Sequence, residues 1–270
     1  MSTPRIDLRG LEIVISFRGA SAERLGNLRT VLRHLDHTYR DYTVWLVEAD
    51  RAPVFAWSEL SDPKVRHLFL CDTRGFSRGA TSNLGVRATR GPVLCLHDAD
   101  VVANPQVFKL CVDDLLDEQR SDAWAPYQQV VNVAGALRAR LAESADFACL
   151  QPHAGVQDPL APDMDMLYAS AAGGITLMRR EAFVRIGGFD PSFQGWGGED
   201  DELLGRAARL GLRWWSVEGT RLFHLHHDSA SRQHWAEGPV GAANHQAAVQ
   251  RRTLDEAAFA AHVEALRARL

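Results

Sequence analysis

Strand-like and helix-like hydrophobic patterns alternate over the first 118 residues of the chain. Short apolar runs rich in β-branched residues predict buried strands at residues 11–17, 44–47, 65–70 and 93–96. Apolar residues spaced three and four apart predict helices at residues 22–35, 77–88 and 105–118, with Ser21 as the cap of the first. This alternation is typical of a parallel, doubly wound sheet with helices on its faces. We therefore expect an α/β fold.

The pattern changes after residue 150. Residues 151–169 hold three prolines and show neither period, so they are expected to form a long loop with a binding or lid function. Beyond this loop the periodicity predicts further strands and helices at residues 174–178, 181–186, 199–210, 213–217 and 221–225. The amphipathic tail from Thr253 to Leu270 opens with Thr253 and Glu256 at capping-box spacing. No internal repeat interrupts what we expect to be a single domain.

Composition narrows the class of protein. A chain of 270 residues with 46% hydrophobic content can bury one substantial core. Its formal net charge of −4 gives no general attraction for nucleic acid or anionic lipid. The four cysteines stand far apart, which argues against a zinc knuckle or a redox pair. No apolar stretch approaches the ~20 residues that span a bilayer, so we expect no transmembrane segment and a cytoplasmic location.

Two acidic residues follow the apolar run at residues 93–96. Asp98 and Asp100 would lie at the carboxyl edge of the predicted sheet, where open α/β sheets bind ligands. Two carboxylates this close repel each other unless a cation lies between them, and oxygen ligands favour Mg²⁺ or Mn²⁺. The alternative is an Asp-rich turn that caps the next helix.

A histidine cluster ends the predicted strand at residues 221–225. His224 and His226 alternate along the strand, so they would share a face and could bind one metal ion. Imidazole ligands favour Mn²⁺ over Mg²⁺. The cluster alone could also be a surface feature or a zinc site. His227 faces the other way and is the reserve candidate.

A segment rich in glycine, aromatic residues and acids runs from residue 187 to residue 202. Glycines flank Trp196, which lets the backbone pass close to a ligand while the indole offers an apolar face to a sugar ring. Glu199 and Asp200 then stand at the start of the predicted helix. The helix dipole alone could explain acids in that position. It does not explain the tryptophan and the glycines beside them.

In combination these motifs resemble one enzyme family. The residues from Gly173 to Arg206 read GGITLMRREAFVRIGGFDPSFQGWGGEDDELLGR. This run resembles the C-terminal module of the β-1,4-galactosyltransferase group, which polypeptide N-acetylgalactosaminyltransferases and chondroitin-polymerase-like enzymes share in weaker form. Further motifs match in the family's order, namely Ser16-Phe17-Arg18, Phe76-Ser77-Arg78 with Asn83 and Gly85, Asp98-Ala99-Asp100 and His224-Leu225-His226.

The resemblance implies a GT-A fold, which is a Rossmann-like, nucleotide-binding mixed sheet flanked by helices. It also implies a UDP-sugar donor and Mn²⁺ (or Mg²⁺), with Asp98, Asp100, His224 and His226 as the metal ligands. Glu199 would bind sugar hydroxyls and Asp200 would deprotonate the acceptor hydroxyl, so that one displacement inverts the anomeric centre. Donor binding is assigned to Ser16, Phe17, Arg18, Glu48, Arg78, Asp98 and Trp196.

On this reading the chain has three parts. Residues 1–150 form the nucleotide-sugar-binding half with the Asp-x-Asp motif, residues 151–235 the acceptor and catalytic half, and residues 236–270 a helical tail. We expect a bacterial hexosyltransferase that acts on a glycan, peptide or natural-product acceptor and could form a homodimer. Ser16 and Ser77 replace the family's Pro and Asn, so the resemblance supports the fold more strongly than it supports the uracil and ribose contacts.

Three alternatives stay open at this point. A retaining N-acetylgalactosaminyltransferase would have Glu-Asn where this chain has Glu199-Asp200, so Asp200 favours inversion. A sugar nucleotidyltransferase would need a basic, Gly-rich loop after the first strand, and residues 16–22 hold only Arg18 and Gly19. A sugar-binding protein without catalysis would be expected to have lost the acids, which are all present.

Overall fold

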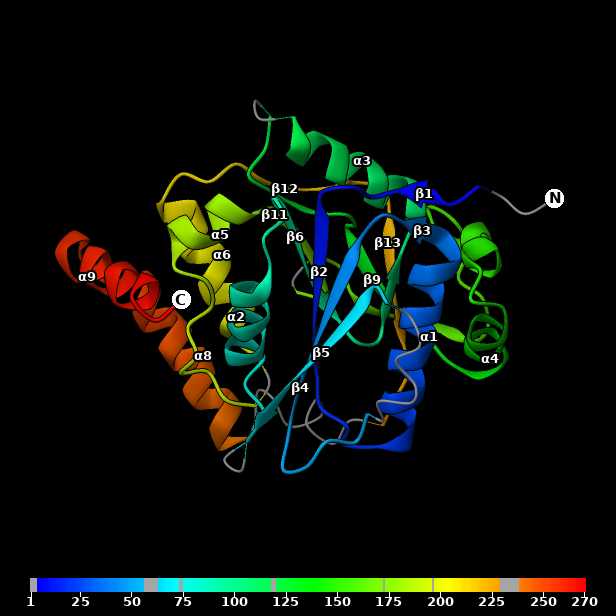
Figure 1. Ribbon diagram of the computed structural model, residues 1–270, viewed down its shortest axis with the longest axis horizontal. Helices are drawn as coiled ribbons and strands as arrows, with labels where there is room; N and C mark the ends of the chain where they lie inside the picture. The colour runs from blue at the N-terminus through cyan, green and yellow to red at the C-terminus, as the bar shows by residue number, and fades with distance from the viewer. Residues whose placement is uncertain are drawn as a thin grey trace.

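A computed structural model describes residues 4–55, 63–72, 75–117, 120–171, 173–195, 197–228 and 238–270 of the protein. Within these residues a seven-stranded sheet of order β12-β8-β11-β6-β2-β4-β5 forms the centre of the molecule (Figure 1). Its strands are β2 (Leu11–Phe17), β4 (Thr43–Asp50), β5 (Val65–Cys71), β6 (Val93–Asp98), β8 (Ala123–Ala125), β11 (Ile175–Arg179) and β12 (Trp214–Ser216). The predicted strands at 11–17, 65–70 and 93–96 match β2, β5 and β6 closely.

The large sheet has a parallel part, built from the strands of the first hundred residues, and a mixed part that later strands add to it. Strands β6, β2, β4 and β5 run parallel to one another. Strand β11 enters antiparallel to β6 and β8, and β12 is parallel to β8. Ser16 and Asp98 are neighbours in the β2–β6 register, so both reach the carboxyl edge of the parallel strands. The predicted mixed α/β architecture is confirmed.

A second, four-stranded sheet of order β10-β9-β13-β7 lies beside the first. Its strands are β7 (Val101–Ala103), β9 (Gln129–Val133), β10 (Met164–Tyr168) and β13 (Arg221–Leu225). Residues Ala99 and Asp100 form a turn between β6 and β7, so the chain passes from one sheet to the other there. Strands β1 (Ile6–Asp7) and β3 (Tyr39–Arg40) form a small parallel pair at the N-terminal edge.

Strand β10 corrects the prediction that residues 151–169 are a loop throughout. It pairs antiparallel with β9 at the edge of the second sheet, and two short 3-10 turns, η2 (Phe147–Cys149) and η3 (Gln151–His153), precede it. Asp165, Met166 and Tyr168 are exposed in this strand. An edge strand with so few buried positions has no clear apolar alternation, which is why its sequence resembles a loop.

Helices cover both faces of the large sheet (Figure 1). One apolar core joins the β2 residues Ile13 and Ile15 to α1 and α3, and another joins Val14 to α2, α5 and α6. The described helices are α1 (Ala22–Thr38), α2 (Arg78–Ala88), α3 (Pro105–Leu116), α4 (Gly135–Ser144), α5 (Arg180–Ile186), α6 (Glu199–Arg209), α8 (Pro239–Arg252) and α9 (Glu256–Arg267). None of these helices combines the length and apolar character needed to cross a membrane.

The caps agree with the sequence at the first helix and differ at the last. The Ser21 side chain accepts a hydrogen bond from the Arg24 N–H, as expected of an N-cap. At α9 the cap is Asp255, whose carboxylate accepts from the Ala258 N–H at 2.8 Å. Thr253 instead ends α8, where its hydroxyl donates to backbone carbonyls. The predicted capping box at Thr253 and Glu256 is therefore wrong, because a second helix precedes it.

The tail packs beside the helices of the second half, as Figure 1 shows for α8 and α9 next to α5 and α6. The Asn244 side chain on α8 donates to the Gln194 carbonyl at 2.8 Å. Arg252 lies 3.7 Å from the Asp201 carboxylate on α6. Strands β11 and β12 pair with β6 and β8 of the first half, so both predicted halves build one sheet. The boundaries at 150 and 235 stay a prediction.

Helix α2 lies directly on the central strands because Gly85 has no side chain. A Cβ at this position would overlap the Val14 side chain and would lie 2.9 Å from Val47 Cγ2. We expect Gly85→Ala to lower the free energy of unfolding by about 1–3 kcal/mol, because the packed sheet cannot yield to the added methyl group. Urea denaturation monitored by circular dichroism would measure it.

Gly26 is the matched control, since a Cβ there meets nothing within 4 Å on the same kind of element, helix α1. Gly26→Ala is expected to raise the free energy of unfolding by roughly 0.5–1 kcal/mol through helix propensity. Equal changes in the free energy of unfolding for the two substitutions would contradict the close packing of α2 on Val14 and Val47 at Gly85.

Candidate active site

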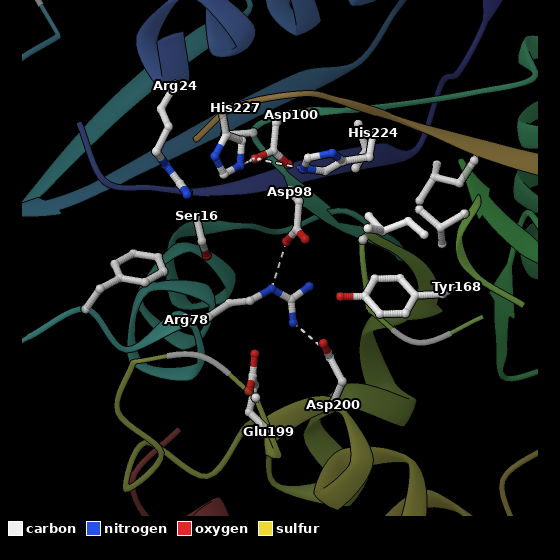
Figure 2. Close-up of a pocket in the computed structure, with 18 of the residues that line it drawn as sticks. Ser16, Arg24, Arg78, Asp98, Asp100, Tyr168, Glu199, Asp200, His224 and His227 are labelled. Carbon is white, nitrogen blue, oxygen red and sulfur yellow. Dashed lines mark hydrogen bonds and ion pairs between the residues drawn. The ribbon is translucent and has the colours of Figure 1, made fainter. Parts of the chain in front are cut away.

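The turn between β6 and β7 directs Asp98 and Asp100 to different partners. Asp100 is buried, and its Oδ2 atom lies 3.0 Å from His227 Nε2 and 3.7 Å from His224 Nε2. The Asp98 carboxylate instead accepts a hydrogen bond from Arg78 Nε at 2.8 Å. Figure 2 shows Asp100 between the two imidazole rings and Asp98 facing Arg78.

Asp100, His224 and His227 form a cluster that fits a divalent metal ion. One ligand atom from each residue lies within 4.8 Å of the others, and all three residues are buried. Burial alone would raise the pKa of Asp100, but the neighbouring His224 and His227 hold it well below its usual value. The carboxylate is therefore ionised, as a metal ligand must be. One carboxylate and two imidazoles are a donor set that suits Mn²⁺ and related ions.

Asn132 on β9 orients the His224 ring. Its Oδ1 atom lies 3.0 Å from His224 Nδ1, which leaves Nε2 directed at Asp100. A hydrogen bond to the second ring nitrogen is the usual support of a metal-binding histidine. Asn132 had no motif in the sequence to identify it.

His226 lies outside this cluster, contrary to the predicted pairing of His224 with His226. Strand β13 ends at Leu225, so the strict alternation of side chains ends there as well. The His226 side chain is 45% exposed, and its Nδ1 contacts Asn132 Nδ2 at 3.1 Å. His227, the reserve candidate, lies beside Asp100 instead.

Arg78 connects Asp98, at the end of β6, to Asp200 on α6. From the first residue of α2 its guanidinium donates to Asp98 Oδ1 at 2.8 Å and to Asp200 Oδ1 at 2.6 Å. Its Cζ atom also lies 5.2 Å from the centre of the Phe189 ring. Asp200 belongs to the first turn of α6, so this arginine links α2, β6 and α6 (Figure 2).

Two carboxyl groups at the start of α6 have raised pKa values. Burial, reinforced by the negative charge of Asp200, raises the pKa of Glu199 from 4.5 to about 7. Burial also raises the pKa of Asp200, although Arg78 opposes the shift. Gly173 makes room for Asp200, because a Cβ at Gly173 would overlap its carboxylate. Perturbed acids in a cavity are typical of functional sites.

A single cavity of about 370 Å³ contains both the metal-type cluster and these acids. Ser16, Arg78, Asp98, Asp100, Glu199, Asp200 and His224 line it, as the sequence led us to expect. Arg24, Tyr168 and His227 line it as well, and of these the sequence predicts only His227, as the reserve candidate.

Other predicted donor-binding residues lie away from the cavity wall. Phe17 is fully buried in the apolar core, and neither Phe17 nor Arg18 lines the cavity. The buried Glu48 carboxylate accepts from the Val54 N–H at 2.6 Å and contacts His67 Nε2 at 2.9 Å. It thus supports the chain that follows β4. Trp196 lies outside the described residues.

Comparison with known proteins supports the resemblance to galactosyltransferases. The family model described as the N-terminal domain of galactosyltransferase matches residues 160–228. These residues are galactosyltransferase-like. β-1,4-Galactosyltransferase 2 of Mus musculus is 41% identical over 46 residues, which is 17% of this chain and 12% of that protein. β-1,4-Galactosyltransferase 4 of Homo sapiens is 47% identical over 36 residues, or 13% and 10% of the two chains.

The predicted resemblance to galactosyltransferases is confirmed, although the chain spans only about a tenth of the length of the curated relatives it matches. The galactosyltransferase-like segment supplies Tyr168, Glu199, Asp200, His224 and His227 to the cavity. Arg78, Asp98 and Asp100 come from the part of the chain before it.

Two solved structures show the fold. The mannosyltransferase PcManGT from Pyrobaculum calidifontis, in complex with GDP-Man and Mn²⁺, aligns with a TM-score of 0.57 at 14% identity over 98% of this chain and 71% of its own. GalNAc-T7 with UDP, GalNAc and Mn²⁺ aligns with a TM-score of 0.58 at 18% identity over 89% of this chain and 47% of its own. The predicted GT-A fold is therefore confirmed.

The two histidines can be distinguished by metal binding. We expect His227→Gln to lower the affinity for Mn²⁺ at least about tenfold, because it removes a ligand beside Asp100. His226→Gln is the control and should bind Mn²⁺ like the unsubstituted protein. Electron paramagnetic resonance titration of free Mn²⁺ measures both. A loss in His226→Gln alone would restore the His224–His226 pairing predicted from the sequence.

The raised pKa of Glu199 predicts a pH-dependent stability. The pKa of Glu199 is about 7 in the folded protein and 4.5 in the unfolded chain, so the folded protein binds the proton more tightly. The stability that this proton contributes is present below pH 4.5 and is lost as the pH rises from 4.5 to 7. Glu199→Gln should remove this dependence. Relative to Glu199→Gln, the unsubstituted protein should lose on the order of 2–3 kcal/mol of unfolding free energy between pH 5 and pH 8.

Denaturant titrations at both pH values measure this difference. Glu256→Gln is the control, because Glu256 also stands in a first helical turn but is exposed. It should show the pH dependence of the unsubstituted protein. An unchanged pH dependence in Glu199→Gln would contradict the raised pKa.

Proposed function

We propose that this protein is a metal-dependent glycosyltransferase that transfers a hexose or N-acetylhexosamine from a UDP-sugar to an acceptor hydroxyl with inversion. The observation that carries the proposal is one cavity with two chemically different ends. Asp100, His224 and His227 form the metal-binding end, and Glu199 and Asp200 form the acidic end. Transfer of a sugar from a nucleotide sugar requires a metal site at the diphosphate and a base near the anomeric carbon of the same bound molecule.

The residues near Asp100 fit the predicted Mn²⁺, and both fold neighbours were solved with Mn²⁺. Asp100, His224 and His227 would hold the ion, with Asn132 orienting His224. Such an ion, when bound, neutralises the negative charge of a diphosphate leaving group. The Asp98 carboxylate is not part of this cluster, because it accepts a hydrogen bond from Arg78 instead. We therefore assign Asp98 to donor binding and His227 to the metal in place of His226.

Asp200 is the candidate base. Its raised pKa makes it a stronger proton acceptor than an exposed aspartate, and Arg78 fixes the direction of its carboxylate. The proton of the acceptor hydroxyl would pass to Asp200 while the hydroxyl oxygen bonds to the anomeric carbon and the nucleoside diphosphate departs. Glu199 titrates near neutral pH, so it can both donate hydrogen bonds to sugar hydroxyls and accept them.

Tyr168 supports an acceptor site at the cavity mouth. Strand β10 places it in the cavity wall, where it is 37% exposed and its hydroxyl points toward the Arg78 guanidinium that also binds Asp200 (Figure 2). An aromatic ring beside a base can stack on a sugar ring that presents its hydroxyl to that base. The segment 151–169 is thus assigned to acceptor binding, and a glycan, peptide or natural product carrying such a sugar remains the expected acceptor.

A donor screen tests the function. The protein with Mn²⁺ is incubated with UDP-galactose, UDP-N-acetylgalactosamine, UDP-glucose, UDP-N-acetylglucosamine and GDP-mannose, with and without sugar acceptors, and nucleotide release is measured. We expect release of UDP, with an inverted anomeric centre in the product by NMR. Pyrophosphate release would indicate nucleotidyl transfer, retention would exclude Asp200 as the base, and binding without release would indicate a sugar-binding protein.

The role of Asp200 predicts a selective loss. Asp200→Asn should lower the transfer rate by about 10²–10⁴-fold, because the amide cannot accept the proton. Its affinity for UDP with Mn²⁺ should stay within about threefold, since the metal-binding end is unchanged. Steady-state kinetics and calorimetry measure the two effects.

Asp201→Asn is the matched control for this substitution. Asp201 is the next residue on α6, and its side chain is half exposed beside Arg252. Normal turnover in Asp200→Asn, or an equal loss in Asp201→Asn, would exclude Asp200 as the base.

A further inference from the structure

Arg24 is a cavity residue to which no motif assigns a role. It lies in the first turn of α1, directly after the carboxyl end of β2, and its side chain lines the same cavity as Ser16, Asp100 and His227. Figure 2 shows the side chain reaching from α1 toward Ser16, at the end of the cavity that holds His227. It lies away from Glu199 and Asp200 in that view.

Among the described residues, the partly buried Arg24 side chain has no carboxylate partner of the kind that engages Arg78 and Arg206. Its Nε atom is buried and has no hydrogen-bond partner among the described residues. Arg78 is engaged by Asp98 and Asp200, and Arg206 by the Glu202 carboxylate. A buried donor on a cation is costly when it is unpaired, and a ligand bound in the cavity that Arg24 lines would satisfy it.

The anionic groups near Arg24 are already engaged. The Asp100 carboxylate lies between His224 and His227, and the charge of Arg24 adds to their effect in lowering its pKa without forming an ion pair. The Glu23 carboxylate, one residue before Arg24, accepts from the Asp228 N–H at 3.0 Å. The guanidinium thus faces a space beside a metal-type cluster, with no carboxylate of the described residues forming an ion pair with it.

We propose that Arg24 binds the diphosphate of the nucleotide donor, next to the metal ion. A guanidinium offers planar, paired donors that match phosphate oxygens and remains charged at every relevant pH. With Arg24 at the metal-binding end, the diphosphate lies there and the sugar points toward Glu199 and Asp200. The proposal rests on the proposed function for the presence of a nucleoside diphosphate, and does not depend on which base the nucleotide carries.

Calorimetry with Mn²⁺ tests the proposal. UDP and uridine are titrated into the unsubstituted protein and into Arg24→Gln, Arg24→Lys and the control Arg29→Gln, which changes an exposed arginine on the same helix. Loss of a charge-assisted hydrogen bond should weaken UDP binding in Arg24→Gln about 10- to 100-fold. Uridine binding should be unchanged, Arg24→Lys should be intermediate, and Arg29→Gln should match the unsubstituted protein.

Thermal unfolding without ligand separates this role from a structural one. Because Arg24 Nε has no hydrogen-bond partner among the residues that the structure describes, Arg24→Gln should leave the Tm unchanged or raise it. An arginine that holds the fold together would lower the Tm on substitution. A lower Tm together with equal losses of UDP and uridine binding would overturn the proposal.

The outcomes also separate this proposal from the proposed function. If the unsubstituted protein and Arg24→Gln bind UDP equally, the Arg24 assignment is wrong and the donor assignment stands. If UDP does not bind but GDP or pyrophosphate binds in an Arg24-dependent way, Arg24 is an anion-binding residue and the UDP donor is wrong. If none of the three binds to the unsubstituted protein with Mn²⁺, both proposals fail.

Discussion

The ion pairs of Arg78 with Asp98 and Asp200 are the interaction on which the site depends. They connect the end of a central strand, the start of α2 and the start of α6. Three acids, Asp98, Glu199 and Asp200, would otherwise repel one another in a largely buried space. One buried arginine offsets that repulsion and fixes the carboxylates in direction. Removing one member would leave an uncompensated buried charge, which costs far more than an exposed ion pair is worth.

The position of Arg78 follows from close packing beneath it. Gly85 lets α2 lie against Val14 and Val47, and a Cβ at Gly79 would lie 2.9 Å from the Phe189 Cβ. Asn83 on the same helix exchanges hydrogen bonds with the Phe189 backbone, accepting at 3.0 Å and donating at 2.9 Å. The first turn of α2 is therefore held from two sides. Helix α2 thus contacts both the parallel strands β2 and β4 and the Phe189 region of the galactosyltransferase-like segment, and the cavity contains residues from both parts.

The sequence predicted the parts of this arrangement that depend on local pattern. Buried strands such as β2 and capped helices such as α1 carry strong periodic signals, and the glycine-rich segment carried the family resemblance. Residues whose placement depends on a strand end or a long-range contact were missed or ranked second. The reserve candidate His227, and not His226, lies beside Asp100 because β13 stops at Leu225. An arginine in an amphipathic helix, such as Arg24, has the same sequence signal whether it faces solvent or a cavity.

The acids on α6 show how opposing effects set the chemistry of the site. A helix N-terminus favours ionised carboxylates and alone would lower their pKa values. Burial and mutual repulsion raise the pKa of Glu199 to about 7 in spite of this position. The burial depends on the tail, because Asn244 of α8 holds the Gln194 carbonyl and its own carbonyl would contact a Cβ at Gly198. Helix α8 therefore supports the turn that precedes the buried Glu199.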